Sequence, residues 1–146
     1  MNLYTIGFTK TTAEHFFERL KAAGVKTLLD VRLWRDGQLS GFAKAVDLEF
    51  FLKRLSETAY VPVPILAPTA DILAAYRAKQ ITWDEYARGY VSLLVERDAA
   101  ASIGRDVLED GCLLCSEPTP GRCHRRLAAE YLASALGTPT INVLHL

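Results

Sequence analysis

Apolar residues follow two patterns along the chain, and together they predict alternating strands and helices. Short runs bounded by glycine or proline predict strands, whereas longer segments with apolar residues every three or four positions predict helices. The predicted strands are 3–7, 25–31, 60–65, 112–115 and 139–144. The predicted helices are 11–20, 47–57, 71–79, 82–97, 120–136 and, more weakly patterned, 99–108.

This alternation predicts an α/β fold, a three-layer domain in which helices cover both faces of a mostly parallel sheet of about five strands. Pro62 and Pro64 place the third strand at an edge of the sheet, because proline cannot donate a ladder hydrogen bond. With right-handed crossovers, the Rossmann-like strand order 3-2-1-4-5 is favoured. That order would bring the carboxyl ends of the first and fourth strands together, where ligands bind in open α/β sheets.

Several helix starts have recognisable capping signals. Thr11 with Glu14, and Thr82 with Glu85, match the capping box, and Asp47 is a plausible cap for the helix that follows it. Thr119 followed by Pro120 predicts the start of the last long helix. Free backbone N–H groups at such a helix start favour anions, so we expect an anion to bind there.

Composition narrows the class of protein. The chain has 146 residues, half of them hydrophobic, which predicts a single domain over 1–146. Seventeen basic residues balance seventeen acidic ones, so an anionic partner would need a local basic patch. The three cysteines and the lack of a secretory leader predict a cytoplasmic protein with free or functional thiols. No apolar run approaches the ~18 residues of a membrane span, so no membrane partner is expected.

The stretch 115–126 has the highest density of reactive side chains in the chain. It follows a buried strand and precedes a helix, and the topology brings it close to residues from the ends of the first two strands. The candidate catalytic residues are Cys115, Cys123, His124, Asp30 and Glu117, and the candidate anion-binding residues are Gly7, Thr9, Arg32, Arg122 and Arg125. Counting 100° per residue predicts that His124 and Arg125 face inward, whereas Arg122 and Arg126 face outward.

Each of these residues also has a simpler structural interpretation. Both cysteines would be small buried hydrophobes, and His124 would bond a strand-end carbonyl. Asp30 and Arg32 would form a buried ion pair. The aromatic stripe of the 82–97 helix, Trp83, Tyr86 and Tyr90, would be core rather than a surface that stacks on bases or other ligands.

A metal site is a further alternative, because Cys112 and Cys115 have C-x-x-C spacing. On a strand, however, these two side chains face opposite sides and cannot share an ion. Cys115, Cys123 and His124, with Asp30 or Glu117, are an alternative ligand set, although no metal is predicted. The sequence does not identify a cofactor.

Four motifs resemble a bacterial family known as domain of unknown function 488. They are Tyr4-Thr5-Ile6-Gly7, Asp30-Val31-Arg32, Cys115-Ser116-Glu117 and Cys123-His124-Arg125, with a Trp/Tyr helix, here 83–90, between them. Two departures are Phe8, where many relatives carry histidine, and Thr9-Lys10 in place of serine-asparagine. The family name implies no assigned activity. Rhodanese-type domains share only a fainter likeness, in the D-V-R strand end and the turn after the cysteine.

Three functional hypotheses remain open. The first is an enzyme acting on a phosphate-bearing or nucleic-acid-related substrate, with a cysteine thiol, His124 as acid/base and Arg32 and Arg125 as anion clamps. The second is a non-catalytic nucleic-acid or nucleotide-binding module, for which the candidate residues are Arg35, Lys44, Arg122, Arg125 and Arg126. The third is a metal-binding or structural Cys/His cluster. Oligomeric state is not predicted.

Overall fold

A computed structural model describes residues 1–37, 41–117, 119–137 and 139–146 of the chain. Its centre is a five-stranded, fully parallel sheet with the order β3-β2-β4-β1-β5. The strands are β1 Asn2–Gly7, β2 Thr27–Asp30, β3 Ala59–Pro62, β4 Gly111–Cys115 and β5 Asn142–His145. The predicted α/β class, the parallel sheet and the edge position of β3 are confirmed.

The strand order differs from the predicted 3-2-1-4-5 in one exchange, because β4 lies between β2 and β1. All five residues of β4 are buried, with Leu113 in the core on one face and Cys112 and Leu114 in the core on the other. A strand that is apolar on both faces is most stable at the centre of a sheet. The predicted adjacency of β1 and β4 is confirmed, with Gly7 beside Cys115.

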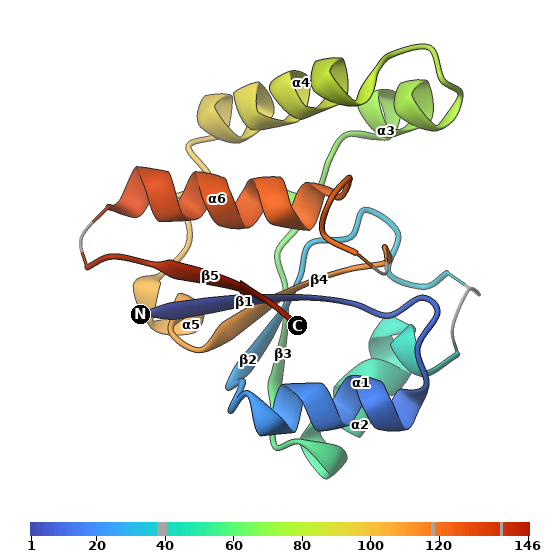
Figure 1. The fold of residues 1–146 in the computed structure, drawn as a ribbon, viewed down its shortest axis with the longest axis vertical. Helices are drawn as coiled ribbons and strands as arrows, with labels where there is room; N and C mark the ends of the chain where they lie inside the picture. Colours follow the sequence, from blue (N-terminus) through green and yellow to red (C-terminus); the bar gives the residue numbers. More distant parts are fainter. Residues whose placement is uncertain (38–40, 118, 138) are drawn as a thin grey trace.

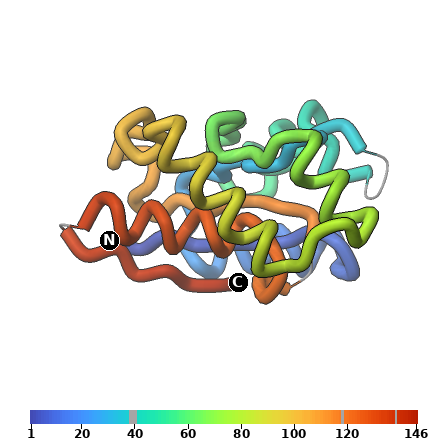
Figure 2. Tube along the Cα trace, turned by 90° about the horizontal axis from the view of Figure 1, so that it is seen from above, coloured from blue at the N-terminus to red at the C-terminus, as the bar shows by residue number. Residues whose placement is uncertain are grey.

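Helices cover both faces of the sheet, as predicted (Figure 1). On one face α1 and α2 pack, and on the other α6 packs, with α4 against α6 and α3 against α4 (Figure 1). Seen from above, α3 and α4 lie nearest the viewer, over α6 and the sheet (Figure 2). The helices are α1 Ala13–Ala22, α2 Ala45–Leu55, α3 Ala70–Arg77, α4 Trp83–Glu96, α5 Arg105–Leu108 and α6 His124–Leu136. Short 3-10 turns occupy Gly41–Ala43 and Pro64–Leu66.

The sheet separates two hydrophobic cores. Phe16, Phe17 and Leu20 of α1 meet Leu48 and Leu52 of α2 in one of them. The other core lies under α4 and α6 and contains Tyr90, Leu94, Leu127 and Leu132, among other residues. The pocket described below opens on the face with α4 and α6.

Local start signals were predicted with mixed success. The capping box of Thr82 and Glu85 is confirmed. The cap of α1 is Thr12 instead of Thr11, and Lys44 precedes α2, so Asp47 lies in the first turn of that helix. Of the weakly patterned segment 99–108, only α5 is helical, because Gly104 interrupts the helical pattern.

The start of α6 was predicted wrongly. The helix begins at His124, with Cys123 as its N-cap, rather than at Pro120 after Thr119. The described residues between β4 and α6, 116–117 and 119–123, form bends and a turn, and two hydrogen bonds from Thr9, just after β1, hold the Ser116 carbonyl. The expected anion site at the Thr119–Pro120 helix start therefore does not exist in that form. Of the predicted 33–46 loop, residues 38–40 lie outside the described part.

None of the helices within the described residues is long and apolar enough to cross a membrane.

Candidate functional site

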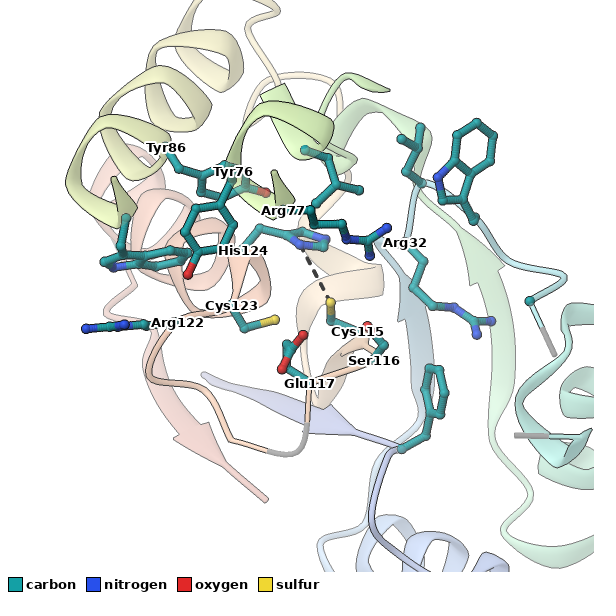
Figure 3. A pocket seen from close by; sticks show the side chains of 16 residues that line it. Arg32, Tyr76, Arg77, Tyr86, Cys115, Ser116, Glu117, Arg122, Cys123 and His124 are labelled. Carbon is teal, nitrogen blue, oxygen red and sulfur yellow. Dashed lines mark hydrogen bonds between the residues drawn. The ribbon is translucent and has the colours of Figure 1, made fainter. Parts of the chain in front are cut away.

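A cavity of about 230 Å³ opens at the carboxyl ends of β2 and β4 (Figure 3). Its floor is formed by Cys115, at the end of β4, and by Cys123 and His124, at the start of α6. The topology predicted this convergence, because parallel strands present their carboxyl ends at one edge of the sheet. Gly7, Thr9, Asp30 and Arg125 lie behind or beside the cavity and do not line it.

Cys115 and His124 form a buried pair at the floor of the pocket. The Cys115 Sγ atom lies 3.6 Å from Nδ1 of His124, and the two residues are 3% and 8% exposed. On the opposite side of the ring, Nε2 lies 2.9 Å from the Val31 carbonyl oxygen. Because a carbonyl only accepts hydrogen bonds, Nε2 carries a proton, and Nδ1 exchanges the second proton with the sulfur.

The surroundings favour charge separation within this pair. The neighbouring Cys123 thiol holds the pKa of Cys115 well below its ordinary value, and the positive charge of His124 acts in the same direction against the effect of burial. Burial alone would lower the pKa of His124, but the Cys115 thiolate and the Val31 carbonyl raise it overall. The pair therefore has the character of a thiolate beside an imidazolium.

Cys123 differs from Cys115 although both are buried. The hydrogen-bonded Cys115 sulfur and burial together raise the pKa of Cys123, so this residue keeps its proton. Cys112 lies in the core on the other face of the sheet, and burial raises its pKa too. The opposite facing of Cys112 and Cys115, predicted from strand geometry, is confirmed.

Arginines give the pocket its electrostatic character. Arg32, Arg77 and Arg122 line it, together with the exposed carboxylate Glu117. Arg32 is buried and fixed, whereas Arg77 and Arg122 are exposed at the mouth. The lining charges leave a net positive pocket, which favours an anionic ligand.

Asp30 orients Arg32 instead of facing the pocket. Its carboxylate is fully buried and accepts hydrogen bonds from Arg32 Nε at 2.9 Å, from Arg32 Nη2 at 2.8 Å and from the Tyr60 hydroxyl at 2.6 Å. On its other side the guanidinium lies over the Phe8 ring, 5.1 Å from the centroid. Asp30 and Arg32 therefore form the buried ion pair that the simpler interpretation predicted.

Arg125, Gly7 and Thr9 hold the loop after Cys115. Arg125 is fully buried and donates from Nη1 to the Glu117 carbonyl, and its Nε donates to Thr5 at 3.4 Å. A Cβ on Gly7 would fall well inside the radius of that same carbonyl oxygen, so only glycine permits the approach. These contacts fix the backbone around Cys115 from below. The predicted inward facing of His124 and Arg125 is confirmed.

An aromatic wall rises from the core to the mouth of the pocket. Tyr90 packs edge-on against His124, 5.6 Å between centroids, and Tyr86 stacks on Tyr90. Trp83 stacks on Tyr86 at 5.4 Å and meets Tyr76 at 5.6 Å. Tyr86 and Tyr90 are buried in the core, as the simpler interpretation expected, and Tyr86 also lines the cavity. Trp83, Tyr76 and Trp34 line it as well, and Trp34 is 63% exposed.

The sequence did not reveal Arg77, Tyr76 or Trp34 as pocket residues. Arg77 and Tyr76 lie at the end of α3, which was predicted as a helix but carries no motif. Trp34 follows Asp30-Val31-Arg32, so its proximity to that motif was the one available signal.

Metal-ligating atoms also gather at the floor. Those of Cys115, Cys123 and His124 lie within 4.8 Å of one another, and all three residues are buried. Two thiols and an imidazole suit a soft or borderline ion such as Zn²⁺. Asp30 is occupied by Arg32 and Tyr60, so it does not complete this set.

One family model matches the chain, over residues 12–132, and its description is Domain of unknown function DUF488. The chain belongs to this family. Comparison with curated proteins and with solved structures gives no match. Within the DUF488 match lie Asp30-Val31-Arg32, Cys115-Ser116-Glu117 and Cys123-His124-Arg125, and Tyr4-Thr5-Ile6-Gly7 precedes it. All four motifs surround the pocket, because they form its floor or hold the strands and the loop beneath it.

Proposed function

We propose that this DUF488 chain is an enzyme in which Cys115 attacks a small anionic, phosphate-bearing substrate held in the pocket. The observation that carries the proposal is the Cys115–His124 pair, with 3.6 Å between Sγ and Nδ1 and the far side of the ring fixed by the Val31 carbonyl. A nucleophile hydrogen-bonded to a base that a third group orients is the arrangement of nucleophilic catalysis.

The chemistry divides between the two residues. The Cys115 sulfur forms a bond to the electrophilic atom of the substrate, and the bond from that atom to the leaving group breaks. The leaving group takes the proton from Nδ1 of His124, which is then the base that removes a proton from water to release the product. Asp30, through Arg32, is a positioning residue in this scheme, and Glu117 lies at the mouth where it would contact the substrate.

The charges of the pocket support an anionic substrate. Arg32 is balanced by Asp30, so Arg77 and Arg122 supply the net attraction against Glu117. Both are exposed and unrestrained by ion pairs within the described residues, so their side chains are free to adjust to a phosphate. The non-catalytic nucleic-acid interpretation has less support, because Arg125 is buried against the Glu117 carbonyl.

Alkylation kinetics test the nucleophile and the anion preference together. The reduced protein is treated with iodoacetamide and with iodoacetate between pH 5 and 9, and Cys115→Ser identifies the reacting thiol. We expect Cys115 to react at pH values well below the ordinary thiol pKa of about 8.5. The ratio of the iodoacetate rate to the iodoacetamide rate should be higher for Cys115 than for a free thiol. Arg77→Gln or Arg122→Gln should each lower that preference by about fivefold, equivalent to ~1 kcal/mol of attraction.

Arg88→Gln is the matched control, because Arg88 is an exposed arginine of α4 outside the pocket and should leave the preference unchanged. An ordinary thiol pKa at Cys115, or an iodoacetate preference indifferent to Arg77 and Arg122, would contradict the proposal.

A second candidate function, a metal centre, is favoured by the convergence of Cys115, Cys123 and His124. Elemental analysis of the purified full chain, before and after chelation, distinguishes it. A stoichiometric transition metal that is lost in Cys123→Ser would favour the metal centre over the nucleophile.

A further inference from the structure

Cys123 takes no part in the attack proposed above, although its sulfur lies beside that of Cys115. The two Sγ atoms are within 4.8 Å of each other, and the residues are 2% and 3% exposed. They approach across the loop that joins β4 to α6, so the pair is intramolecular and local. Both are free thiols.

We propose that Cys115 and Cys123 form a two-cysteine redox centre that reduces a small hydroperoxide and closes to a disulfide. The inference rests on the reactive Cys115 of the proposed function and adds a second activity at the same site. Cys115 is the residue that the oxidant meets, and Cys123 is the resolving cysteine.

The steps balance with a hydroperoxide as oxidant and a dithiol as reductant. The Cys115 thiolate attacks the terminal oxygen, so an S–O bond forms and the O–O bond breaks. Cys115 becomes a sulfenic acid, and the departing alkoxide takes the His124 proton to leave as an alcohol. The Cys123 sulfur then attacks the Cys115 sulfur, its proton leaves with the hydroxyl as water, and the disulfide forms. An external dithiol restores both thiols and is itself oxidised to a disulfide.

The helix cap does not restrain the Cys123 sulfur from making this bond. Cys123 is the N-cap of α6, yet its side chain makes no capping hydrogen bond, so moving it costs the helix no cap. A disulfide needs a sulfur separation of about 2.05 Å, so the two side chains must rotate toward each other. The loop is anchored at its Cys115 end, through Thr9 to Ser116 and Arg125 to Glu117.

Arg125 favours the resolving step electrostatically. Its Nη1 atom lies 3.9 Å from the Cys123 sulfur. A positive charge at that distance stabilises the negative charge that develops on Cys123 as it loses its proton. The cavity of about 230 Å³ admits a small hydroperoxide to Cys115, and the slight exposure of the sulfurs excludes a protein partner from direct attack.

Cys112 provides an internal control. It is fully buried in the core on the opposite face of the sheet, so its sulfur does not reach the pocket. Cys112→Ser should therefore oxidise as the unmodified chain does.

The full chain is reduced, and its metal content is measured by elemental analysis. It is then treated with one equivalent of hydrogen peroxide. Free thiols are counted by maleimide mass shift, and sulfenic acid is trapped with dimedone. We expect two thiols lost per peroxide, a Cys115–Cys123 disulfide in the peptide map and no dimedone adduct. Cys123→Ser should instead give a dimedone adduct on Cys115, and Cys112→Ser should match the unmodified chain.

Two results would overturn the redox centre. One is a sulfenic or sulfinic Cys115 in the unmodified chain while Cys123 remains a free thiol. The other is a bound metal at Cys115, Cys123 and His124 that blocks oxidation until it is chelated. Rapid, anion-dependent alkylation of Cys115 without disulfide formation would remove this inference and leave the proposed function standing. Disulfide formation in a protein whose alkylation shows no preference for iodoacetate would remove the anionic substrate of the proposed function and leave the redox centre standing.

Discussion

His124 has a separate partner for each of its two ring nitrogens. Nε2 donates to the Val31 carbonyl, and Nδ1 faces the Cys115 sulfur. The backbone just after β2 therefore fixes the proton on Nε2 and leaves Nδ1 for the sulfur at the end of β4. The edge of Tyr90 packs against the ring and prevents it from turning. A histidine held in this way uses Nδ1 alone for proton transfer, because Nε2 is occupied by the Val31 carbonyl.

Replacing His124 by asparagine should shift the pH dependence of Cys115 alkylation to higher pH. The shorter side chain keeps a polar group near the sulfur but cannot carry the positive charge that lowers the pKa of Cys115. At pH values below the pKa of Cys115, the alkylation rate should fall about tenfold for each unit by which the pKa of Cys115 rises.

The measurement is the iodoacetamide rate between pH 5 and 9. His15→Asn, in the exposed first turn of α1, is the matched control and should leave the profile in place. An unchanged profile in His124→Asn would show that the imidazolium does not stabilise the thiolate.

At the residue scale, the sequence predicted those site residues that share a motif or a helical face. The helical periodicity of 100° per residue predicted that His124 and Arg125 face inward, and both are buried. It could not reveal that Arg125 holds the Glu117 carbonyl or that Asp30 serves Arg32, because those partners depend on backbone positions across the sheet. Arg77 reaches the pocket only through the packing of α3 on α4.

At the scale of elements, the loop between β4 and α6 determines the shape of the pocket. A threonine-proline pair predicted that the helix would begin at Pro120, but it begins at His124. Tertiary hydrogen bonds from Thr9 to the Ser116 carbonyl and from Arg125 to the Glu117 carbonyl fix the start of this loop, and residues 119–122 form bends and a turn instead of a helix. These contacts override the local helix signal, because an N-cap residue stabilises a helix by only about 1 kcal/mol.

Gly7→Ala should displace this loop. The new Cβ would overlap the Glu117 carbonyl and crowd Arg125 Nη1, so we expect a loss of about 3 kcal/mol in the free energy of unfolding, as for overpacked sites. The alkylation rate of Cys115 should change at the same time, since its backbone moves.

Urea unfolding measures the first effect. Gly121→Ala is the control, because a Cβ there meets nothing within 4 Å and should change stability by no more than about 0.5 kcal/mol. Equal stabilities for the two variants would contradict the constraint assigned to Gly7.

At the scale of the whole molecule, the sequence predicted the α/β class, the parallel sheet and the edge that carries the pocket. The order of the two central strands was wrong, since β1 and β4 are both buried along most of their length and apolar patterning cannot rank them. The site was predictable despite this error, because either order places the ends of β1 and β4 side by side. What matters for the pocket is that adjacency.

Anion binding should alter the tryptophan emission of the intact protein. The chain has two tryptophans, and both Trp34 and Trp83 line the pocket. Titrating pyrophosphate into the reduced protein should change the emission in a saturable way, and the change should weaken in Arg77→Gln. Trp34→Phe and Trp83→Phe assign the signal, and binding seen by calorimetry with constant emission would place the anion elsewhere.

The position of these two indoles has a practical consequence. In most proteins the fluorescence of several tryptophans is averaged over the fold, but here every indole in the chain is at one opening. The unlabelled protein therefore reports ligand binding by its own fluorescence, and candidate ligands can be screened against it without an assay for a reaction.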